Sequence, residues 1–518
     1  MLIEDQSEVA ALLSRPETYG ADVDRVDRRE THASIIFLAG TRAFKLKRSV
    51  RYPYLDYSSA ALRRKYCEAE LEVNRRTAPD IYYRVVPVVR TRAGSLALGG
   101  DDEDAVDWVI EMERFDEDVL FDRLAEQGRL DRYAMEDLAD AVARFHRNAE
   151  PRRDAGGAAG IAHVLDGNRA CFADVDPAVL DRDGTDRLVA RSQQALEAVA
   201  PLLDRRRDQG LVRHCHGDLH LRNIIVRDGH AVLFDAIEFD PAFAEIDVLY
   251  DLAFLVMDLE FRGLGGLGSV LLNRYLDNTG DAAGLPALPL FLSMRAAIRS
   301  HVDAAAAAAQ SQKDAAAPLA RMAARYLDLA LSFLEPGRPR LIAVGGLSGS
   351  GKSRLARELA PAIGAGPGAR VVRTDSTRKR LAGVTLGTRL GPQDYSEAMS
   401  KRVYQAIYDE AQVALAAGRP VIADAVFARQ QERDAVTRIA RDAGVPFQGF
   451  WLEAAPRVLE QRVTGRRNNV SDATPEVVRL QLDYDLGVID WERLDSSGEG
   501  DETLKAALAV LSRETPVA

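Results

Sequence analysis

Two stretches of this chain carry residue types and spacings that suit the binding of phosphate groups. The later one, residues 346–353, reads Gly-Leu-Ser-Gly-Ser-Gly-Lys-Ser and fits the spacing G-x-x-x-x-G-K-[ST] between a strand pattern and a helix pattern. Glycines there let backbone N–H groups turn inward onto phosphate oxygens, and the start of the helix adds positive potential. Lys352 would reach the outer phosphates and Ser353 would ligate Mg²⁺. The rest of the loop would be formed by Gly346, Ser348, Gly349, Ser350 and Gly351.

Two acids follow apolar strand patterns in the same region. Residues 419–424 end in Asp424, where a carboxylate would steady magnesium or its water. A second strand pattern delivers Asp375, and a carboxylate beside a transferable phosphate can orient and deprotonate a hydroxyl. Arg378, three residues later, can hold an anionic substrate group. Plainer roles stay open for both acids: a turn or cap for Asp424, and the N-cap of the next helix for Asp375.

A basic stretch lies farther along the chain, at residues 462–472, between two helix patterns. It contains Gly, Asn and three arginines, among them Arg466 and Arg467. Arginines on such a lid can close over phosphates and stabilise the charge of the transition state. A solvated basic loop is the alternative.

The earlier stretch, residues 216–223, reads His-Gly-Asp-Leu-His-Leu-Arg-Asn and precedes two strand patterns, the second ending in Asp235. Asp218 would face a hydroxyl, while Asn223 and Asp235 would supply oxygen ligands for Mg²⁺. Ordinary polar turn residues are the alternative. Acids that follow would suit a polyol or a cationic amine if they lined a cleft, although helix capping accounts for most of them. They are Asp240, Glu245, Asp247, Asp251 and Asp258.

The elements that must position these residues fall into two groups. A hairpin over residues 32–50 turns at Ala39-Gly40-Thr41 and places Lys45 and Lys47 on one strand face. A helix over 60–76 and further strands complete a β-rich lobe by about residue 115. Helices then dominate to about residue 335, including the alanine-rich runs.

A break follows at residues 335–340, where two prolines and a glycine interrupt the pattern. Beyond it, strands and helices alternate, which predicts a parallel α/β sheet. The predicted strands are 341–345, 370–374, 420–424 and 446–452, and the predicted helices are 352–363, 396–417 and 429–443.

Composition narrows the classes of partner. The 68 basic and 79 acidic side chains leave a net charge of -11, which disfavours binding to nucleic acid or to an anionic membrane surface. The three cysteines have neither disulfide-framework nor zinc-cluster spacing. The first residues lack the pattern of a signal peptide, so a cytoplasmic protein is expected.

The later half resembles the small P-loop kinases related to gluconate kinase and polynucleotide 5'-hydroxyl kinase. The resemblance covers about residues 340–495 and rests on the loop at 346–353, Thr-Asp-Ser-Thr-Arg at 374–378, the strand ending in Asp424 and the basic lid. It implies that Asp375 receives the hydroxyl proton, that Arg378 binds an anionic group, and that the nucleotide is ATP.

The earlier half resembles the aminoglycoside phosphotransferase and choline kinase group, whose pattern is H-G-D-x-x-x-x-N followed by a strand ending in Asp. Its flanking segments most resemble a bacterial subfamily fused to such a P-loop domain. The resemblance implies that Asp218 is the catalytic base, that Asn223 and Asp235 bind Mg²⁺, and that His216 holds the loop.

By the same resemblance, Lys45 or Lys47 pairs with Glu70 and contacts the nucleotide phosphates; the sequence leaves the choice between the two lysines open. The segment before the lysine strand, residues 28–34, has no glycine, so the glycine-rich phosphate cover found in many kinases is missing.

The sequence therefore predicts an α+β bilobal, protein-kinase-like domain of the aminoglycoside phosphotransferase type at 1–335, with lobes of about 1–115 and 116–335. An α/β P-loop domain with a parallel sheet follows at 340–518. The predicted function is ATP- and Mg²⁺-dependent phosphoryl transfer, at two sites, to a hydroxyl of a sugar, cyclitol or aminoglycoside-like metabolite. A single active kinase domain regulated by a P-loop ATP-binding module, or a nucleic-acid end kinase, are the alternatives. The acceptors and the oligomeric state stay open.

Overall fold

The computed structural model describes residues 4–52, 55–310, 312–465 and 470–513. Contacts divide the chain into two compact units that are not continuous in sequence. The amino-terminal unit runs to Gly160 and includes Asp204–Leu255, and the carboxy-terminal unit comprises Ile161–Leu203 and the chain from Val256 onward. Helices after residue 256, which the sequence groups with the earlier domain, therefore share a compact unit with the P-loop half.

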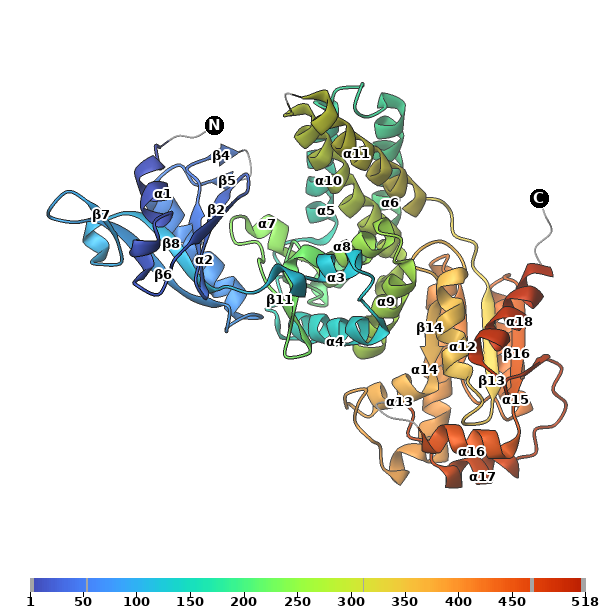
Figure 1. Cartoon of the computed structure of the whole chain (residues 1–518). Coiled ribbons are helices and arrows are strands. Elements are labelled where there is room, and N and C mark those ends of the chain that lie inside the picture. Colours follow the sequence, from blue (N-terminus) through green and yellow to red (C-terminus); the bar gives the residue numbers. More distant parts are fainter. Residues whose placement is uncertain (1–3, 53–54, 311, 466–469, 514–518) are drawn as a thin grey trace. The chain divides into compact units, whose positions relative to one another are not determined.

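The amino-terminal unit is built on a six-stranded sheet in the order β1-β2-β3-β8-β6-β7, with antiparallel neighbours (Figure 1). The predicted hairpin is confirmed, since β2 and β3 pair in register around Gly40, which has a positive φ of 57°. The strands are β1 Val26–Glu30, β2 Ser34–Ala39, β3 Arg42–Lys47, β6 Tyr82–Arg90, β7 Leu96–Leu98 and β8 Ala105–Glu113.

Apolar side chains cover both faces of this sheet. Leu13 of α1 (Ser7–Leu13) packs with Phe37 and Leu46 in one buried cluster, and Cys67 of α2 (Ala60–Arg75) packs with Ile110 in another. The loop at 216–223 lies between β9 and β10, among the other elements of this unit. These elements are β4 Arg51–Tyr52, β5 Leu55–Asp56, α3 Phe121–Glu126, α4 Arg132–Asn148, β9 Val212–His214, β10 Ile224–Arg227, β11 His230–Leu233, α7 Pro241–Ala244 and β12 Glu245–Asp247.

The carboxy-terminal unit combines helices with a five-stranded parallel sheet in the order β14-β15-β13-β16-β17. The predicted alternation of strands and helices beyond residue 340 is thus confirmed. The sheet strands are β13 Leu341–Gly346, β14 Arg370–Arg373, β15 Val421–Asp424, β16 Phe447–Glu453 and β17 Glu492–Asp495. Its helices are α12 Lys352–Leu359, α13 Thr374–Leu381, α14 Glu397–Ala416, α15 Gln430–Asp442, α16 Pro456–Thr464, α17 Pro475–Leu482 and α18 Gly500–Arg513.

Other helices complete the chain, and the alanine-rich runs are helical as predicted, in α10 and α11. These helices are α5 Gly157–Ala173, α6 Arg182–Asp208, α8 Val248–Phe261, α9 Gly265–Thr279, α10 Leu288–Ala308 and α11 Lys313–Phe333. None of the helices in the described ranges has the length and apolar character needed to cross a bilayer.

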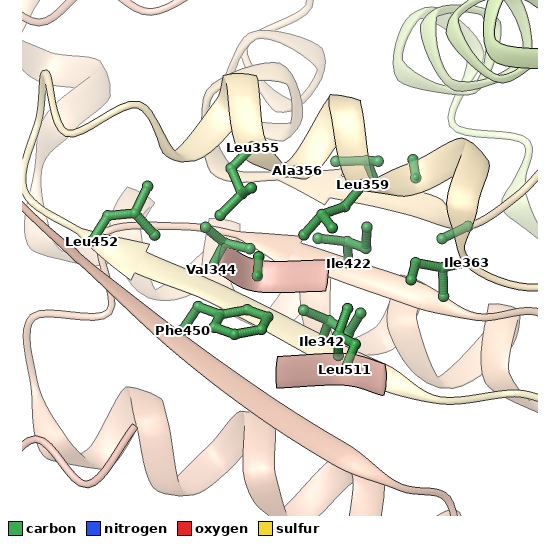
Figure 2. Close-up of a cluster of buried hydrophobic side chains, with 14 of the residues drawn as sticks. Ile342, Val344, Leu355, Ala356, Leu359, Ile363, Ile422, Phe450, Leu452 and Leu511 are labelled. Atoms are coloured by element: carbon green, nitrogen blue, oxygen red, sulfur yellow. The ribbon is translucent and has the colours of Figure 1, made fainter. Parts of the chain in front are cut away.

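The core of the parallel sheet includes buried side chains of α12 and α18, and Figure 2 shows most of its residues. Ile342 and Val344 of β13 are buried beside Phe450 of β16, and Leu359 of α12 packs onto the same cluster. All six residues of β13 are buried, as expected for a central parallel strand covered on both faces. This packing fixes the strand end from which the loop at 346–353 departs.

We expect Leu359→Ala to lower the free energy of unfolding by about 2–5 kcal/mol, because it leaves a cavity among fully buried neighbours. The matched control is Leu480→Ala, whose side chain is 65% exposed and should change stability by less than about 0.5 kcal/mol. Urea unfolding of the full chain, followed by the fluorescence of Trp451 and Trp491 in a Trp108→Phe background, measures both. Equal losses would contradict this description of the core.

Candidate functional sites

The amino-terminal site contains a network of two lysines and three acids, buried except at Asp235. Lys45 and Lys47 lie on the same face of β3, as predicted, and both bind Glu70 of α2, at 2.7 and 2.6 Å. Lys45 also binds Asp235 at 2.7 Å, whereas Lys47 pairs with Glu238. The neighbouring acid on α2, Glu68, pairs instead with Arg64 on the outside of the helix.

Electrostatics keeps this network ionised. Burial opposes protonation of Lys45, but Asp235 and Glu70 outweigh it and raise the pKa of Lys45 well above its usual value. Burial likewise opposes the charge on Lys47, whose pKa is raised by Glu238 and Glu70. Burial would raise the pKa of Glu70, but the two lysines hold it well below its usual range. Glu70 therefore holds both lysines as a fully buried carboxylate.

The loop at 216–223 places Asp218 beside Asn223. The Asn223 Nδ2 atom donates to the Asp218 carbonyl at 2.9 Å and to its carboxylate Oδ2 at 3.0 Å. The Phe234 N–H donates to the Asn223 carbonyl, which ties the end of β11 to this loop. The Asp218 side chain is 38% exposed, so the carboxylate is accessible from solvent.

Asp235 sits at a strained turn. Its φ of 60° lies in the left-handed region, which costs a non-glycine residue roughly 1–3 kcal/mol. Hydrogen bonds on both sides hold the turn: the Asp235 N–H donates to the Tyr82 hydroxyl, and the Ala236 N–H donates to the Asn74 side chain. The conformation directs the carboxylate onto Lys45.

Asp251 is a structural residue that sequence reasoning misplaced. The sequence offered it as a cleft-lining acid, but it is fully buried, accepts from the N–H groups of His216 and Gly217, and contacts His146 at 3.1 Å. It therefore anchors the start of the loop that carries Asp218. Asp251 lies inside the most apolar helix pattern of the chain, and an acid buried there must have a partner. This position was the signal in the sequence that indicated a structural role.

The other acids offered for a cleft are also engaged. Asp247 is buried in an ion pair with Arg206, Glu245 pairs with Arg152, and Asp258 pairs with Arg262. Asp240 is the N-cap of α7, which agrees with the alternative that these acids cap helices.

His216 has the loop-holding place expected of it. Its Nε2 lies 2.9 Å from the Phe234 carbonyl, and burial lowers the pKa of the imidazole below its usual value. The next residue, Gly217, has φ 84°, and a Cβ there would lie 2.7 Å from the Phe243 carbonyl. The backbone at this position thus requires glycine.

In the carboxy-terminal unit, the loop between β13 and α12 has the shape of a phosphate cradle. Gly346, Gly349 and Gly351 all have positive φ angles. A Cβ on Gly346 or on Gly349 would lie within 2.6 Å of a neighbouring backbone carbonyl oxygen. The Ser350 hydroxyl is buried and has no hydrogen-bond partner among the described residues. The Lys352 ammonium donates to the Leu347 carbonyl across the loop at 2.9 Å. A buried hydroxyl without a partner and a close glycine turn fit a bound phosphate chain.

Parallel register brings Asp424 to the edge of this loop. Asp424 pairs with Val344 on one side and with Arg373 on the other, so its carboxylate lies at the strand end that leads into the loop. It is buried, and Arg373 Nε approaches it at 3.2 Å. Burial opposes the charge on Arg373, but Asp424, together with Asp277 and Asp375, outweighs it and raises the pKa of the arginine.

Asp375 is the second residue of α13, whose N-cap position is Arg373. The alternative that Asp375 serves as the N-cap is therefore wrong. Arg378 follows one turn later, is buried, and lies 4.8 Å from the centre of the Tyr395 ring. Its Nε has no partner in the part of the chain that the structure describes.

Asp472 and Gln481 are further residues of this site that the sequence did not single out. Asp472 accepts from the Tyr395 hydroxyl at 2.9 Å and binds Lys379, so it joins the end of the basic stretch to α13. Gln481 of α17 accepts from the Ser348 N–H at 2.7 Å. The predicted lid arginines, Arg466 and Arg467, lie outside the described residues.

Comparison with known protein families identifies the class of each domain. Residues 55–288 match the model of the phosphotransferase enzyme family, and residues 341–484 match that of an AAA domain. The chain thus joins an aminoglycoside-phosphotransferase-type kinase domain to a P-loop kinase domain, and it is a phosphotransferase.

The chain belongs to the family of the uncharacterized proteins Rv2004c and MT2060 of Mycobacterium tuberculosis and Mb2027c of Mycobacterium bovis. Each is 31% identical over 493 residues, which cover 93% of this chain and 94% of the relative.

Among solved structures, a choline/ethanolamine kinase family protein from Mesorhizobium loti is similar at 13% identity over 63% of this chain and 98% of that one, with a TM-score of 0.36. A gluconokinase from Sinorhizobium meliloti 1021 is similar at 22% identity over 34% of this chain and 93% of that one, with a TM-score of 0.25.

The two lysines of β3 should respond differently to substitution. Lys45→Met leaves Asp235 hydrated, since that side chain is 43% exposed, and Glu70 keeps Lys47. We expect little loss of stability but at least about tenfold weaker nucleotide binding, because a charge-assisted contact is lost. Lys47→Met removes the cation paired with the buried carboxylate of Glu238, although Glu70 keeps Lys45, and it should cost about 3–5 kcal/mol of folding stability.

Urea unfolding and calorimetry with Mg²⁺ and AMP-PNP, both in a Lys352→Ala background, distinguish the two lysines. Equal effects of the two substitutions on affinity and stability would contradict the separate roles.

Proposed function

We propose that the protein is an ATP- and Mg²⁺-dependent kinase with two phosphotransfer sites, each acting on a hydroxyl of a small polar metabolite such as a sugar, cyclitol or aminoglycoside-like compound. The observation that carries the proposal is that each half of the chain has a lysine and an acid at the positions that its motif assigns to phosphate binding and to the acceptor hydroxyl. These are Lys45 with Asp218, and Lys352 with Asp375.

In the amino-terminal site, Lys45 is the nucleotide lysine, because it reaches both Glu70 and Asp235, whereas Lys47 is committed to Glu238. Asn223 and Asp235 would hold Mg²⁺ through their side-chain oxygens. Bound Mg²⁺-ATP supplies the phosphoryl group. Asp218 accepts the hydroxyl proton on its carboxylate, which the Asn223 amide holds in a fixed orientation.

In the carboxy-terminal site, the backbone N–H groups of the loop and Lys352 bind the phosphates, and Ser353 and Asp424 would hold Mg²⁺. Asp375, at the start of α13, accepts the hydroxyl proton, and Arg378 binds an anionic group of the acceptor. Arg466 and Arg467 would stabilise the charge that develops during transfer.

Asp218 and Asp235 should separate catalysis from nucleotide binding. We expect Asp218→Asn to lose phosphoryl transfer at the amino-terminal site while nucleotide affinity is kept, because Asp218 is assigned to the acceptor. Asp235→Asn should instead weaken the binding of Mg²⁺ with AMP-PNP, because it removes a metal ligand. Calorimetry in a Lys352→Ala background measures both, and an equal loss of affinity in the two variants would rule out this division.

Lys352→Ala should lower transfer at the carboxy-terminal site by about 10²-fold or more without unfolding the domain, because the residue stabilises charge on the moving phosphoryl group. The matched control is Lys401→Ala, whose side chain is 73% exposed on α14. The assay is ATP consumption over sugars, cyclitols, aminoglycosides and oligonucleotides, with Asp218→Asn present to silence the other site. Unchanged turnover in Lys352→Ala would refute the assignment, and transfer to oligonucleotides alone would favour an end kinase.

A further inference from the structure

The open edge of the parallel sheet is paired by a side chain from α9. Strand β14 is one of the two edge strands of this sheet, and an edge strand presents unpaired backbone groups. Asn273 of α9 meets two of them: its Nδ2 donates to the Ala369 carbonyl at 3.1 Å, and its Oδ1 accepts from the Val371 N–H at 2.8 Å. The side-chain amide thus takes the place of a neighbouring strand.

One turn farther along α9, Asp277 reaches the helix that follows this strand. Its Oδ1 accepts from Arg370 at 2.7 Å, and its Oδ2 accepts from the Ser376 hydroxyl at 2.7 Å. All three side chains are at least nine-tenths buried. Ser376 is the residue next to Asp375, so the buried carboxylate of Asp277 restrains the first turn of α13.

The carboxyl-terminal end of α13 is held by Glu410, which also binds Arg370. Glu410 of α14 binds Arg370 at 2.8 Å and Arg380 of α13 at 2.9 Å. Burial opposes the charge on Arg370, but Glu410 and Asp277 outweigh it and raise its pKa above the usual value. Helix α13 is therefore fixed at both ends by buried charged groups, one of which belongs to α9.

Helix α9 lies within the residues that match the phosphotransferase family, 55–288, and not within the P-loop match. We propose that Asp277 is a positioning residue for the P-loop kinase site: acting through Ser376, it holds Asp375 where an acceptor hydroxyl must be met. The P-loop site is then complete only with a helix supplied by the other family domain. This inference rests on the proposed role of Asp375 as the acceptor-facing acid.

The test uses the full chain carrying Asp218→Asn, with Mg²⁺-ATP as the probe and water as the acceptor. Asp277→Ala should lower kcat for ATP hydrolysis about tenfold or more, since a small misplacement of a reacting group is costly, while KM for ATP stays unchanged. Asp277→Asn can still bond both Arg370 and Ser376 and should restore kcat to within about twofold of the parent. Thr279→Ala, at the end of the same helix, is the control.

Hydrogen exchange gives a readout that needs no turnover. Asp277→Ala should speed exchange of the amides of α13 and leave those of α12, under the phosphate loop, unchanged. Ser376→Ala removes the same contact with a smaller change and should act in the same direction, which keeps the test valid if Asp277→Ala does not fold.

Unchanged kcat together with unchanged exchange in α13 would overturn the proposal. So would a rise in KM for ATP that matches the fall in kcat, or a failure of Asp277→Asn to rescue, because either indicates a general packing role. If the parent chain neither hydrolyses ATP nor transfers phosphate to any acceptor of the ATP-consumption screen, the proposed function of the P-loop site fails. Selective loosening of α13 with intact AMP-PNP binding would still establish the contact that Asp277 makes.

Discussion

The pairing of buried charges is the interaction on which both sites depend. An ionised group removed from water costs several kcal/mol unless opposite charges or hydrogen bonds replace its hydration. Glu70 is stable inside the amino-terminal unit because two lysines share it, and Arg370 is stable inside the carboxy-terminal unit because Asp277 and Glu410 flank it. Since such pairs tolerate little movement, they hold the two lysines of β3 and the start of α13 in place.

Local sequence was enough to predict those parts of the sites whose functional residues lie close together in the chain. The strand, glycine loop and helix around Lys352 follow one another within a few residues, so pattern and motif point to the same structure. The hairpin that carries Lys45 and Lys47 was predictable for the same reason, because alternation of side chains sets which residues share a face. Alternation could not choose between the two lysines, because they differ in partners that are distant in sequence, Asp235 for Lys45 and Glu238 for Lys47.

The features that the sequence did not predict are of two kinds. Some involve buried polar or charged side chains, and others depend on contacts between residues that are far apart in the sequence. Helix α13 has no apolar stripe: Arg378 and Lys379 are buried in it, so hydrophobic periodicity gives no signal. Asp251 and Asp277 act on backbone or side chains far away in sequence, and spacing alone cannot reveal such contacts. The position of Asp375 therefore reflects both its own segment and a helix almost a hundred residues earlier.

We propose that the chain holds two complete nucleotide sites. The most direct measurement is the number of AMP-PNP molecules bound per full-length chain in the presence of Mg²⁺, by calorimetry or native mass spectrometry, for the parent and for Lys352→Ala. The account predicts two for the parent and one for the variant. One per parent chain, or two retained in the variant, would contradict it.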